Sequence, residues 1–541
     1  MLTGPMFMLQ VYDRVLGSRS EETLLALFIL MGFLFGMMGL LDFVRGRVLT
    51  RIGAQFQAQL DGRVFGAMIK RASVVQGDPG ATSGLRDLEA VQRLMASPVF
   101  AALFDIPWTP VFLLGITVFH PWLGMLAVGG GGLLIMVTIL NQLMTRNPVM
   151  ETNRAVAQAE HFSEQIRTEA EMVRSLGMQK AAFTRWNVAR GRALSHSVMS
   201  SDRTGGFTTL SKTFRLFLQS AMLGLGAYLV LNAGLTPGAM IASSILLGRA
   251  LAPLDLAIGQ WPLIQRATKG WSNLAELLAT VPVDAERMPL PVPKAKLSVQ
   301  QLTVVPPGEK VASLRMVSFD VNPGEALGVI GPSGSGKTTL ARALTGVWRP
   351  AGGKIRLDGA SLDQYDPDVL GQYIGFLPQR VQLFDGTIAD NIARLSTEPD
   401  AVKIIEAAKK AAAHDMILKL PEGYDTRVSA GGGRLSGGQV QRIGLARAMY
   451  GDPVFLVLDE PNSNLDNEGS QALNTAIRQM KADGKSVLIM AHRPAAIEEC
   501  EKLLVLDMGA RRAFGPRDEV MKEVLQNYSA VRRSAGPGGV T

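Results

Sequence analysis

The chain has 541 residues, more than a single domain usually holds, and 47% of them are hydrophobic. Its mean hydropathy of +0.17 is high for a soluble protein. The only cysteine, Cys500, excludes an intrachain disulfide and argues against a thiol metal site. The sequence therefore indicates two or three domains, with part of the chain in a membrane.

The N-terminus is apolar but short. Residues 1–9 cover only half a membrane span, and residues 10–20 (QVYDRVLGSRS) suit an external loop. The segment is unlike a signal peptide, because no basic region or small-residue cleavage site flanks a full apolar core. We expect a first membrane helix that either begins upstream of this start or enters only part of the bilayer.

Five further segments are apolar enough to cross a bilayer. The first has eighteen residues without a charge, about 27 Å of helix at 1.5 Å per residue. The segments are residues 24–41, 99–119, 122–140, 207–231 and 236–254.

Some of these spans contain charged residues. Lys212 and Arg215 lie in the fourth, Arg249 lies in the fifth, and Asp105 stands among prolines that should kink the second. Charges at membrane depth are expensive and usually face a cavity or a partner. Two interpretations stay open for Asp105 and Arg249: they face a translocation route, or they snorkel or pair at the interface.

Arginine and lysine concentrate in two long segments, residues 45–98 and 141–206, whereas the turns at His120 and Asn232 contain none. The positive-inside rule predicts that both long segments are cytoplasmic. Membrane topology thus explains the net charge of +8, and we expect no nucleic-acid partner.

Each long segment is broken near its middle, at residues 77–84 and at residues 171–178 around Gly177. We interpret both segments as paired helices that descend from the membrane, turn and return. Such turns would transmit motion from a cytoplasmic domain to the membrane; two solvated hairpins are the alternative.

The proline-dense residues 281–296 lack apolar periodicity and indicate a semi-rigid linker. We therefore expect a transmembrane domain over residues 1–280 and a second domain over residues 297–530. Residues 531–541 are expected to form a disordered tail.

A phosphate-binding loop, GPSGSGKTT, directly follows the apolar run 326–330. Its glycines let backbone N–H groups turn onto a polyphosphate, Lys337 reaches the terminal phosphates, and the Thr338 hydroxyl can bind Mg²⁺. The candidate nucleotide-binding residues here are Gly331, Pro332, Ser333, Gly334, Ser335, Gly336, Lys337, Thr338 and Thr339.

Two later motifs support this interpretation. Residues 435–439 read LSGGQ, and residues 454–460 read VFLVLDE, an apolar strand that ends in Asp459 and Glu460. Without context, two carboxylates after a strand suit a solvated turn. After a phosphate loop and LSGGQ at this spacing, they favour a catalytic site.

Together these motifs resemble the nucleotide-binding domain of ABC transporters, over residues 297–527. The resemblance makes Gln379 in FLPQ a contact to Mg²⁺ and to the attacking water, Asp459 a support for Mg²⁺ and Glu460 the general base. It also makes His492, after the strand 486–490, a γ-phosphate sensor and catalytic residue, and it places a D-loop at Asn464, Leu465 and Asp466.

The resemblance implies a site shared by two chains. In the family, each ATP held by one subunit meets the LSGGQ motif of its partner, here Ser436, Gly437, Gly438 and Gln439. Lys337, Mg²⁺ and the loop amides would stabilise the charge on the phosphates while Glu460 activates water. We expect a homodimer, and a lone chain should be nearly inactive.

One position departs from the family pattern. ABC domains usually stack an aromatic residue on adenine, and the aligned stretch here, residues 302–307, offers Val305 instead. Either valine simply packs against the base, or stacking and ATP selectivity are weaker.

The resemblance implies a multi-domain membrane protein, with an all-α transmembrane domain of about six helices, the first truncated, and an α/β P-loop ATPase domain. Residues 8–27 and 238–271 resemble the type I secretion branch, which exports unfolded polypeptides such as metalloproteases and lipases. That branch implies a multi-pass protein of the bacterial inner membrane with a cytoplasmic ATPase domain. Its partners would be a periplasmic adaptor, an outer-membrane channel and a secreted polypeptide.

Other interpretations remain open. An exporter of lipids, drugs or other small molecules uses the same ATPase, as does an ATP-gated channel. A non-transport ABC ATPase is nearly excluded, because those proteins lack spans like residues 24–41.

Overall fold

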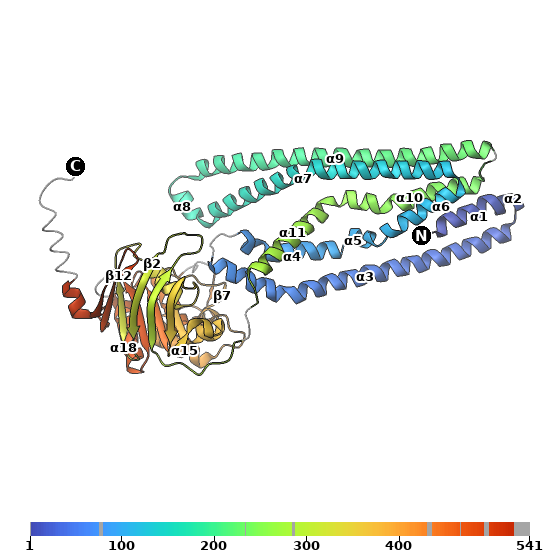
Figure 1. Cartoon of the computed structure of the whole chain (residues 1–541). Coiled ribbons are helices and arrows are strands. Elements are labelled where there is room, and N and C mark those ends of the chain that lie inside the picture. Colours follow the sequence, from blue (N-terminus) through green and yellow to red (C-terminus); the bar gives the residue numbers. More distant parts are fainter. Residues whose placement is uncertain are drawn as a thin grey trace, which may run out of the picture. The chain divides into compact units, whose positions relative to one another are not determined.

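The computed structural model describes residues 2–74, 79–232, 234–283, 287–429, 435–465, 467–491 and 497–523. The chain divides into two compact units, one formed by Met1–Ile69 with Asp78–Pro282 and the other by Lys70–Gly77 with Val283–Thr541. The first unit is built of helices, and the second contains all the strands of the described residues (Figure 1).

The helices of the first unit are long, and several carry a proline at their first or second position, where the missing N–H is not needed. In chain order they are α1 (Thr3–Gln10), a π-helical turn (Val11–Val15), α2 (Leu16–Ser18), α3 (Glu21–Val74), α4 (Pro79–Met95), α5 (Pro98–Leu103), a 3-10 turn (Ile106–Trp108), α6 (Thr109–Phe119), α7 (Pro121–Thr168), α8 (Ala170–Ser175), α9 (Gln179–Leu231), α10 (Pro237–Gly259) and α11 (Trp261–Thr280).

Five stretches of the described residues are helical, long and apolar enough to cross a membrane, and each overlaps one predicted span. They are Glu21–Val74, Pro98–Phe119, Pro121–Thr168, Gln179–Leu231 and Pro237–Gly259. Helix α1, with eight residues, is too short to be among them.

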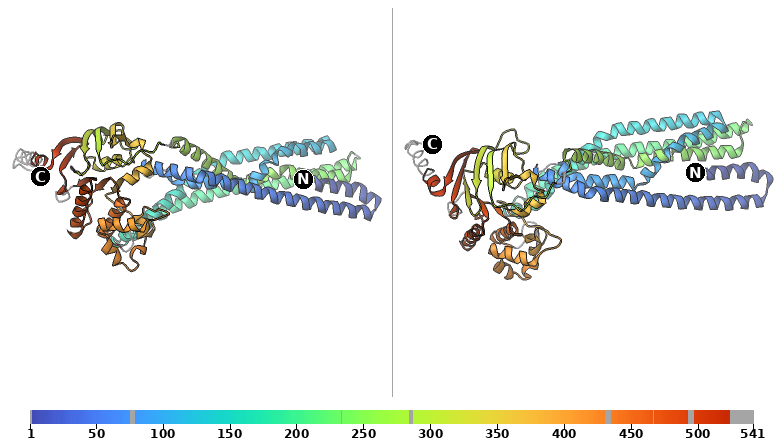
Figure 2. Two further views of the ribbon diagram at one scale, coloured as in Figure 1. Left: turned by 90° about the horizontal axis from the view of Figure 1, so that it is seen from below. Right: turned by 60° about the horizontal axis from the view of Figure 1, so that its bottom comes forward.

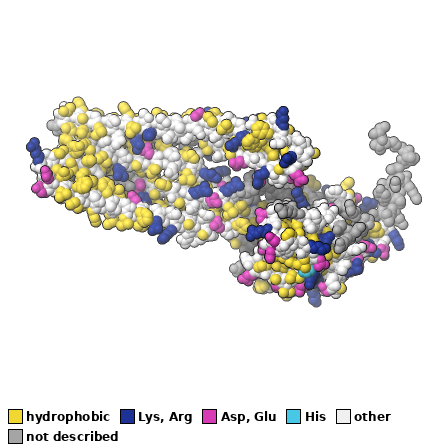
Figure 3. Space-filling model, turned by 180° about the vertical axis from the view of Figure 1, so that it is seen from behind, with side chains coloured by type: hydrophobic (Ala, Val, Ile, Leu, Met, Phe, Trp, Pro, Cys, Tyr) yellow, Lys and Arg dark blue, Asp and Glu magenta, His cyan; other side chains and the backbone are white. Residues whose placement is uncertain are grey.

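Large apolar side chains are exposed along these helices. None of the span in α3 is buried within the chain, and Phe28, Ile29 and Phe33 are each more than half exposed. Figure 3 shows hydrophobic side chains gathered over the end of the helical unit that carries α1 and α2. Exposed apolar surface of this extent suits contact with lipid or with another protein.

The expected external loop at residues 10–20 was wrong. The helix continues through the π-helical turn and α2 to Ser18, and only Arg19 and Ser20 lie outside a helix, Arg19 with a φ of +53°. Val15 is buried, and the Asp13 carboxylate accepts hydrogen bonds from the Thr236 hydroxyl at 2.7 Å and the Gly238 N–H at 2.8 Å. Because a helix N-terminus favours a negative charge, this contact with the start of α10 stabilises the helical form.

The two expected breaks differ in outcome. The chain turns at Gly177, whose φ of +66° suits glycine, between α8 and α9. Of the break expected at residues 77–84, residues 77 and 78 lie outside the described residues, and the rest was wrong because α4 already begins at Pro79.

Helices α7 and α9 run side by side along much of their length (Figure 2). A Cβ atom at Gly130 on α7 would clash with Cδ1 of Leu218 on α9, so the leucine side chain would have to shift. Small residues permit this close approach between membrane helices. The adjoining buried cluster includes Phe112, Ile116 and Met222.

Among the described residues, ion pairs between arginine and aspartate join helical segments that are distant in sequence. Asp105, at the predicted kink between α5 and α6, lies 3.1 Å from Arg45 of α3. Arg215 of α9 lies 2.7 Å from Asp255 of α10. Asp105 is therefore paired within the chain, whereas Arg249 is exposed.

The strands of the second unit form a ten-stranded sheet in the order β5-β4-β1-β2-β12-β11-β3-β10-β9-β6, and β7 pairs with β8. Its elements are β1 (Leu297–Val304), β2 (Leu314–Val321), β3 (Ala326–Ile330), α12 (Lys337–Leu344), β4 (Gly352–Leu357), β5 (Ala360–Ser361), a 3-10 turn (Leu362–Gln364), α13 (Pro367–Tyr373), β6 (Ile374–Leu377), β7 (Gly386–Thr387), α14 (Ile388–Ile392), α15 (Ala401–Lys410), α16 (His414–Leu418), a 3-10 turn (Gly423–Asp425), β8 (Arg427–Val428), α17 (Gly437–Met449), β9 (Phe455–Asp459), α18 (Asn467–Ala482), β10 (Ser486–Ala491), β11 (Lys502–Asp507) and β12 (Ala510–Pro516).

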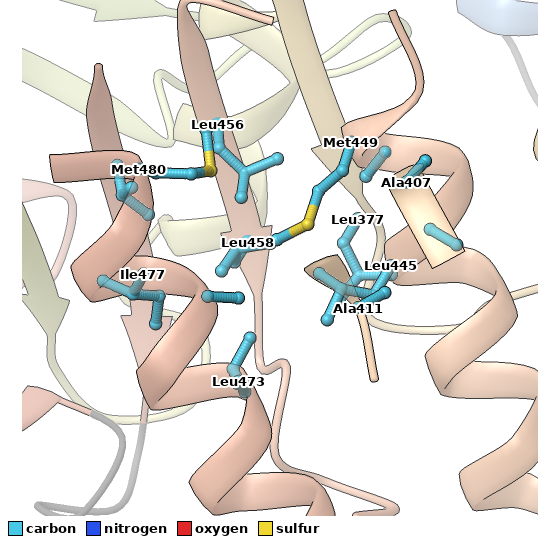
Figure 4. Close-up of a cluster of buried hydrophobic side chains, with 14 of the residues drawn as sticks. Leu377, Ala407, Ala411, Leu445, Met449, Leu456, Leu458, Leu473, Ile477 and Met480 are labelled. Carbon is cyan, nitrogen blue, oxygen red and sulfur yellow. The ribbon is translucent and has the colours of Figure 1, made fainter. Parts of the chain in front are cut away.

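The central strands are buried on both faces, which explains why they read as continuous apolar runs. In β9, Leu456 and Leu458 point toward one cluster, while Phe455 and Val457 point toward the other. Figure 4 shows the first cluster, in which side chains of β9 meet those of α17 and α18. This packing fixes the parallel strands whose ends carry the candidate site.

Candidate functional site

Four neighbouring parallel strands, β3, β10, β9 and β6, end at the same edge of the sheet. Ile330 pairs with Ala491, Met490 with Asp459, and Leu377 with Leu458. The residues that follow these ends therefore gather where open α/β sheets bind ligands. They include the three sequence-predicted residues Gly331, Glu460 and Gln379.

The phosphate-binding loop runs from β3 into α12. Gly334 and Gly336 have φ values of +79° and +99°, which favour glycine, and a Cβ at Gly336 would stand 2.7 Å from Leu314 Cδ2. Ser335 is 2% exposed, and its hydroxyl has no hydrogen-bond partner among the described residues. The exposed loop residues are Pro332, Ser333 and Gly334; Thr338 and Thr339 lie in the first turn of α12.

Lys337 is the first residue of α12 and is buried. Its ammonium donates hydrogen bonds to the carbonyl oxygens of Gly331 at 2.9 Å and Pro332 at 3.0 Å. Burial lowers the pKa of Lys337, and the negative charges of Glu460 and Asp459 oppose that shift. The loop therefore holds a desolvated cation beside two carboxylates, an arrangement suited to an anionic ligand.

Asp459 ends β9 and is 1% exposed. Burial raises the pKa of Asp459, whereas a hydrogen bond with the Thr338 side chain lowers it. Oxygen Oδ2 is buried and has no hydrogen-bond partner among the described residues. A carboxylate with a spare oxygen beside a hydroxyl is a donor set that Mg²⁺ prefers, so these residues fit that ion.

Glu460 adopts a left-handed backbone conformation with a φ of +51°, which is uncommon for a residue with a side chain. Its backbone N–H donates to the carbonyl of Met490 on β10 at 2.9 Å, so the neighbouring strand supports this conformation. Backbone strain of this kind tends to occur at functional sites.

The LSGGQ motif forms the start of α17. Ser436 caps the helix: its hydroxyl accepts from the Gln439 N–H at 3.3 Å, and its own N–H donates to the Gln439 side chain at 2.8 Å. A Cβ at Gly437 would lie 3.7 Å from Asn464, and one at Gly438 would lie 3.0 Å from the Asn464 carbonyl. The motif therefore packs against Asn464 of the expected D-loop.

The remaining predicted residues are placed as follows. Gln379 is exposed, two residues after β6, and Val305 is half-buried, directly after β1. His492 and Asp466 lie outside the described residues, although Ala491, the residue before His492, ends β10 at the site edge.

Sequence reasoning missed Arg447, in the last turn of α17. It donates to the Gln382 carbonyl at 3.0 Å, and its guanidinium lies 5.8 Å from the centre of the Phe384 ring. It thus holds the segment after Gln379 against α17. A basic residue at a helix end has many ordinary explanations, so the sequence offered no signal for this contact.

The fold and site define an ATP-hydrolysing membrane transporter, and comparisons with known proteins agree. Residues 1–252 match the family described as the ABC transporter transmembrane region, and residues 314–463 match the ABC transporter family. The chain belongs to the ABC transporters, with membrane and ATPase domains fused in one polypeptide. It is an ATPase coupled to transport, and the expected fold class is confirmed.

Its relatives point to one branch. The "Type I secretion system ATP-binding protein PrsD" of Rhizobium meliloti is 42% identical over 534 residues, covering 99% of this chain and 92% of the relative. The "Leukotoxin translocation ATP-binding protein LktB" of Mannheimia haemolytica is 27% identical, covering 98% of this chain and 75% of its own length. These relatives support ABC-driven secretion as the activity of the chain.

The fold also has a solved counterpart. A bacterial Atm1-family ABC exporter with ATP bound superposes with a TM-score of 0.82 at 24% identity, covering 99% of this chain and 96% of that one. At this identity the likeness shows the fold alone.

Proposed function

We propose that the chain exports unfolded polypeptides across the bacterial inner membrane as a homodimer, with its ATPase domain in the cytoplasm. The observation that carries the proposal is the 42% identity with a type I secretion ATP-binding protein, which extends over both the membrane and the ATPase parts. Type I secretion further implies a periplasmic adaptor and an outer-membrane channel as partners.

In this proposal each residue of the site has a defined task. Lys337 and the backbone N–H groups of the loop, which Pro332 lacks, bind the phosphates of ATP, and Val305 contacts the adenine. Glu460 orients and deprotonates the attacking water, Gln379 contacts Mg²⁺ and that water, and His492 senses the γ-phosphate. Phosphoryl transfer needs mainly positioning and electrostatic stabilisation, which these groups provide.

Thr338, Asp459 and Gln379 would hold Mg²⁺, which when bound neutralises charge on the phosphates. The unpaired Oδ2 of Asp459 supports this assignment. Residues 436–439 of one subunit are proposed to contact the ATP bound by the other, so that each site needs two chains.

The test is ATPase activity and transport in vesicles that contain the purified full-length protein. Unfolded polypeptides that carry a C-terminal secretion signal should raise ATP hydrolysis, and loss of this chain from cells should abolish secretion of the cognate protein. Stimulation by lipids or drugs, with no response to any polypeptide, would contradict the proposal in favour of a small-molecule exporter.

A further inference from the structure

A buried amide side chain joins two parts of the candidate site. Gln441 lies on α17, two residues after LSGGQ, and is 2% exposed. Its Nε2 donates to the Pro461 carbonyl at 3.0 Å, and its Oε1 accepts from the Asn464 amide at 3.4 Å. Because buried polar groups are costly unless paired, these contacts hold Gln441 and both partners in place.

The two partners belong to the segment that follows β9. Pro461 is the next residue after Glu460, whose left-handed conformation is fixed on its other side by the hydrogen bond to Met490. Asn464 packs against Gly437 and closely against Gly438. A displacement of α17 would therefore be passed to the carbonyl beside Glu460.

We infer that Gln441 is a positioning residue that couples the two ATP sites of the dimer. The inference rests on the proposed function, in which Glu460 acts on the ATP of its own chain while residues 436–438 contact the ATP of the partner. The Gln441 amide then fixes the position of Glu460, the base of one ATP site, relative to the LSGGQ motif of the same chain, which completes the other ATP site. Binding or loss of ATP at one site thereby adjusts Glu460 at the other.

The alternative is that Gln441 merely fills space between α17 and the segment after β9. The substitution Gln441→Met separates these roles, since methionine has nearly the same length and volume but forms neither hydrogen bond. Asn464→Leu removes the donor of the hydrogen bond from the Asn464 amide to Gln441 Oε1. The exposed Gln372 on α13 provides a matched control, Gln372→Met.

The experiment measures ATP hydrolysis against ATP concentration for the full-length protein in lipid, together with nucleotide affinity. We expect Gln441→Met to bind ATP normally but to lose about tenfold in kcat, the factor that one hydrogen bond can supply, and its Hill coefficient should fall to about 1. Asn464→Leu should have a similar effect and add little in the double variant, because the two residues act as a unit. Gln372→Met should match the wild type.

Three outcomes would overturn the inference: an unchanged kcat and Hill coefficient in Gln441→Met, a kcat loss accompanied by an equal loss of ATP binding, or effects that add fully in the double variant. The underlying proposal is tested separately. If the wild-type protein hydrolyses ATP as a single subunit and without cooperativity, the proposed dimer is wrong. If both the wild type and Gln441→Met hydrolyse ATP cooperatively, only the coupling role of Gln441 is wrong.

Discussion

At the residue scale, Val305 replaces the aromatic residue that is usual in the family, and it is half-buried directly after β1. We expect Val305→Tyr to tighten ATP binding about fivefold, since an aromatic face against a base contributes roughly 1 kcal/mol beyond its buried area. Titration of both proteins with ATP and GTP measures the effect and the gain in selectivity. An unchanged nucleotide affinity would show that Val305 does not contact the base.

Asp459 gives a second test at this scale. Because its pKa is raised in the folded protein, the native state binds the proton more tightly than the unfolded state does. This group therefore destabilises the fold above the raised pKa, and its cost declines as the pH falls below that value and vanishes below the pKa of the unfolded chain. Without nucleotide, Asp459→Asn should raise the free energy of unfolding at neutral pH, by about 1 kcal/mol on the scale of a single interaction.

The same substitution should abolish hydrolysis that depends on Mg²⁺. In the wild type, affinity for MgATP should fall on acidification at a higher pH than an ordinary aspartate would give, because only the ionised carboxylate binds the ion. Thermal unfolding and MgATP titrations across this pH range measure both effects. If Asp459→Asn were less stable than the wild type and its ATP hydrolysis still depended on Mg²⁺, the assignment of Asp459 as a Mg²⁺ ligand would be contradicted.

At the scale of elements, Asp13 fastens the segment after α1 to the start of α10. We expect Asp13→Ala to destabilise this contact by about 0.5–1 kcal/mol, the usual cost of losing a cap. Hydrogen exchange of the Gly238 and Ala239 amides should become faster. In Asp13→Asn, which keeps one acceptor oxygen, the exchange rate of these amides should lie between the rates in the wild type and in Asp13→Ala. Equal exchange rates in all three proteins would show that the contact does not hold α10.

The elements that could be predicted from the sequence are those marked by a motif or an apolar run of consecutive residues. The loop 331–336 and the apolar run of β9 carry their chemistry in consecutive residues, and the spans are long apolar runs. The pairs Arg45–Asp105 and Arg215–Asp255 join positions far apart in the chain, so no local pattern revealed them. The prediction of a loop at residues 10–20 was wrong for the same reason: the segment is helical, and its helical form depends on a contact with the distant helix α10.

The site follows the same rule. Asp459 and Glu460 could be predicted because they end a recognisable strand. The structure adds contacts between residues far apart in the sequence, which motif spacing does not predict. The strain at Glu460 and the burial of Gln441 depend on residues 20 to 30 positions away. Arg447 likewise reaches Gln382, 65 positions earlier in the chain.

At the scale of the whole molecule, the proposed mechanism separates ATP binding from hydrolysis. Glu460→Gln should bind ATP, hold two chains together and stop turnover, because the amide cannot accept the proton from water. Lys337→Ala should instead weaken nucleotide binding itself. Size measurements with ATP present distinguish the two variants, and repeated turnover by Glu460→Gln would show that another group is the base.

The only native cysteine permits a direct test of the shared site. Cys500 is buried, and burial raises its pKa to about 12, so it should not react at neutral pH. Ser333 and Ser436 are both exposed, the first in the phosphate-binding loop and the second at the start of α17. Cysteines introduced at these positions can therefore be cross-linked selectively.

The decisive measurement uses two differently tagged chains, one carrying Ser333→Cys and the other Ser436→Cys, mixed in lipid and oxidised with and without MgATP. If two chains close around each nucleotide, a disulfide should form between the two kinds of chain and should increase strongly with MgATP. ATP hydrolysis by the same preparation without any such cross-link would contradict a site built from two subunits.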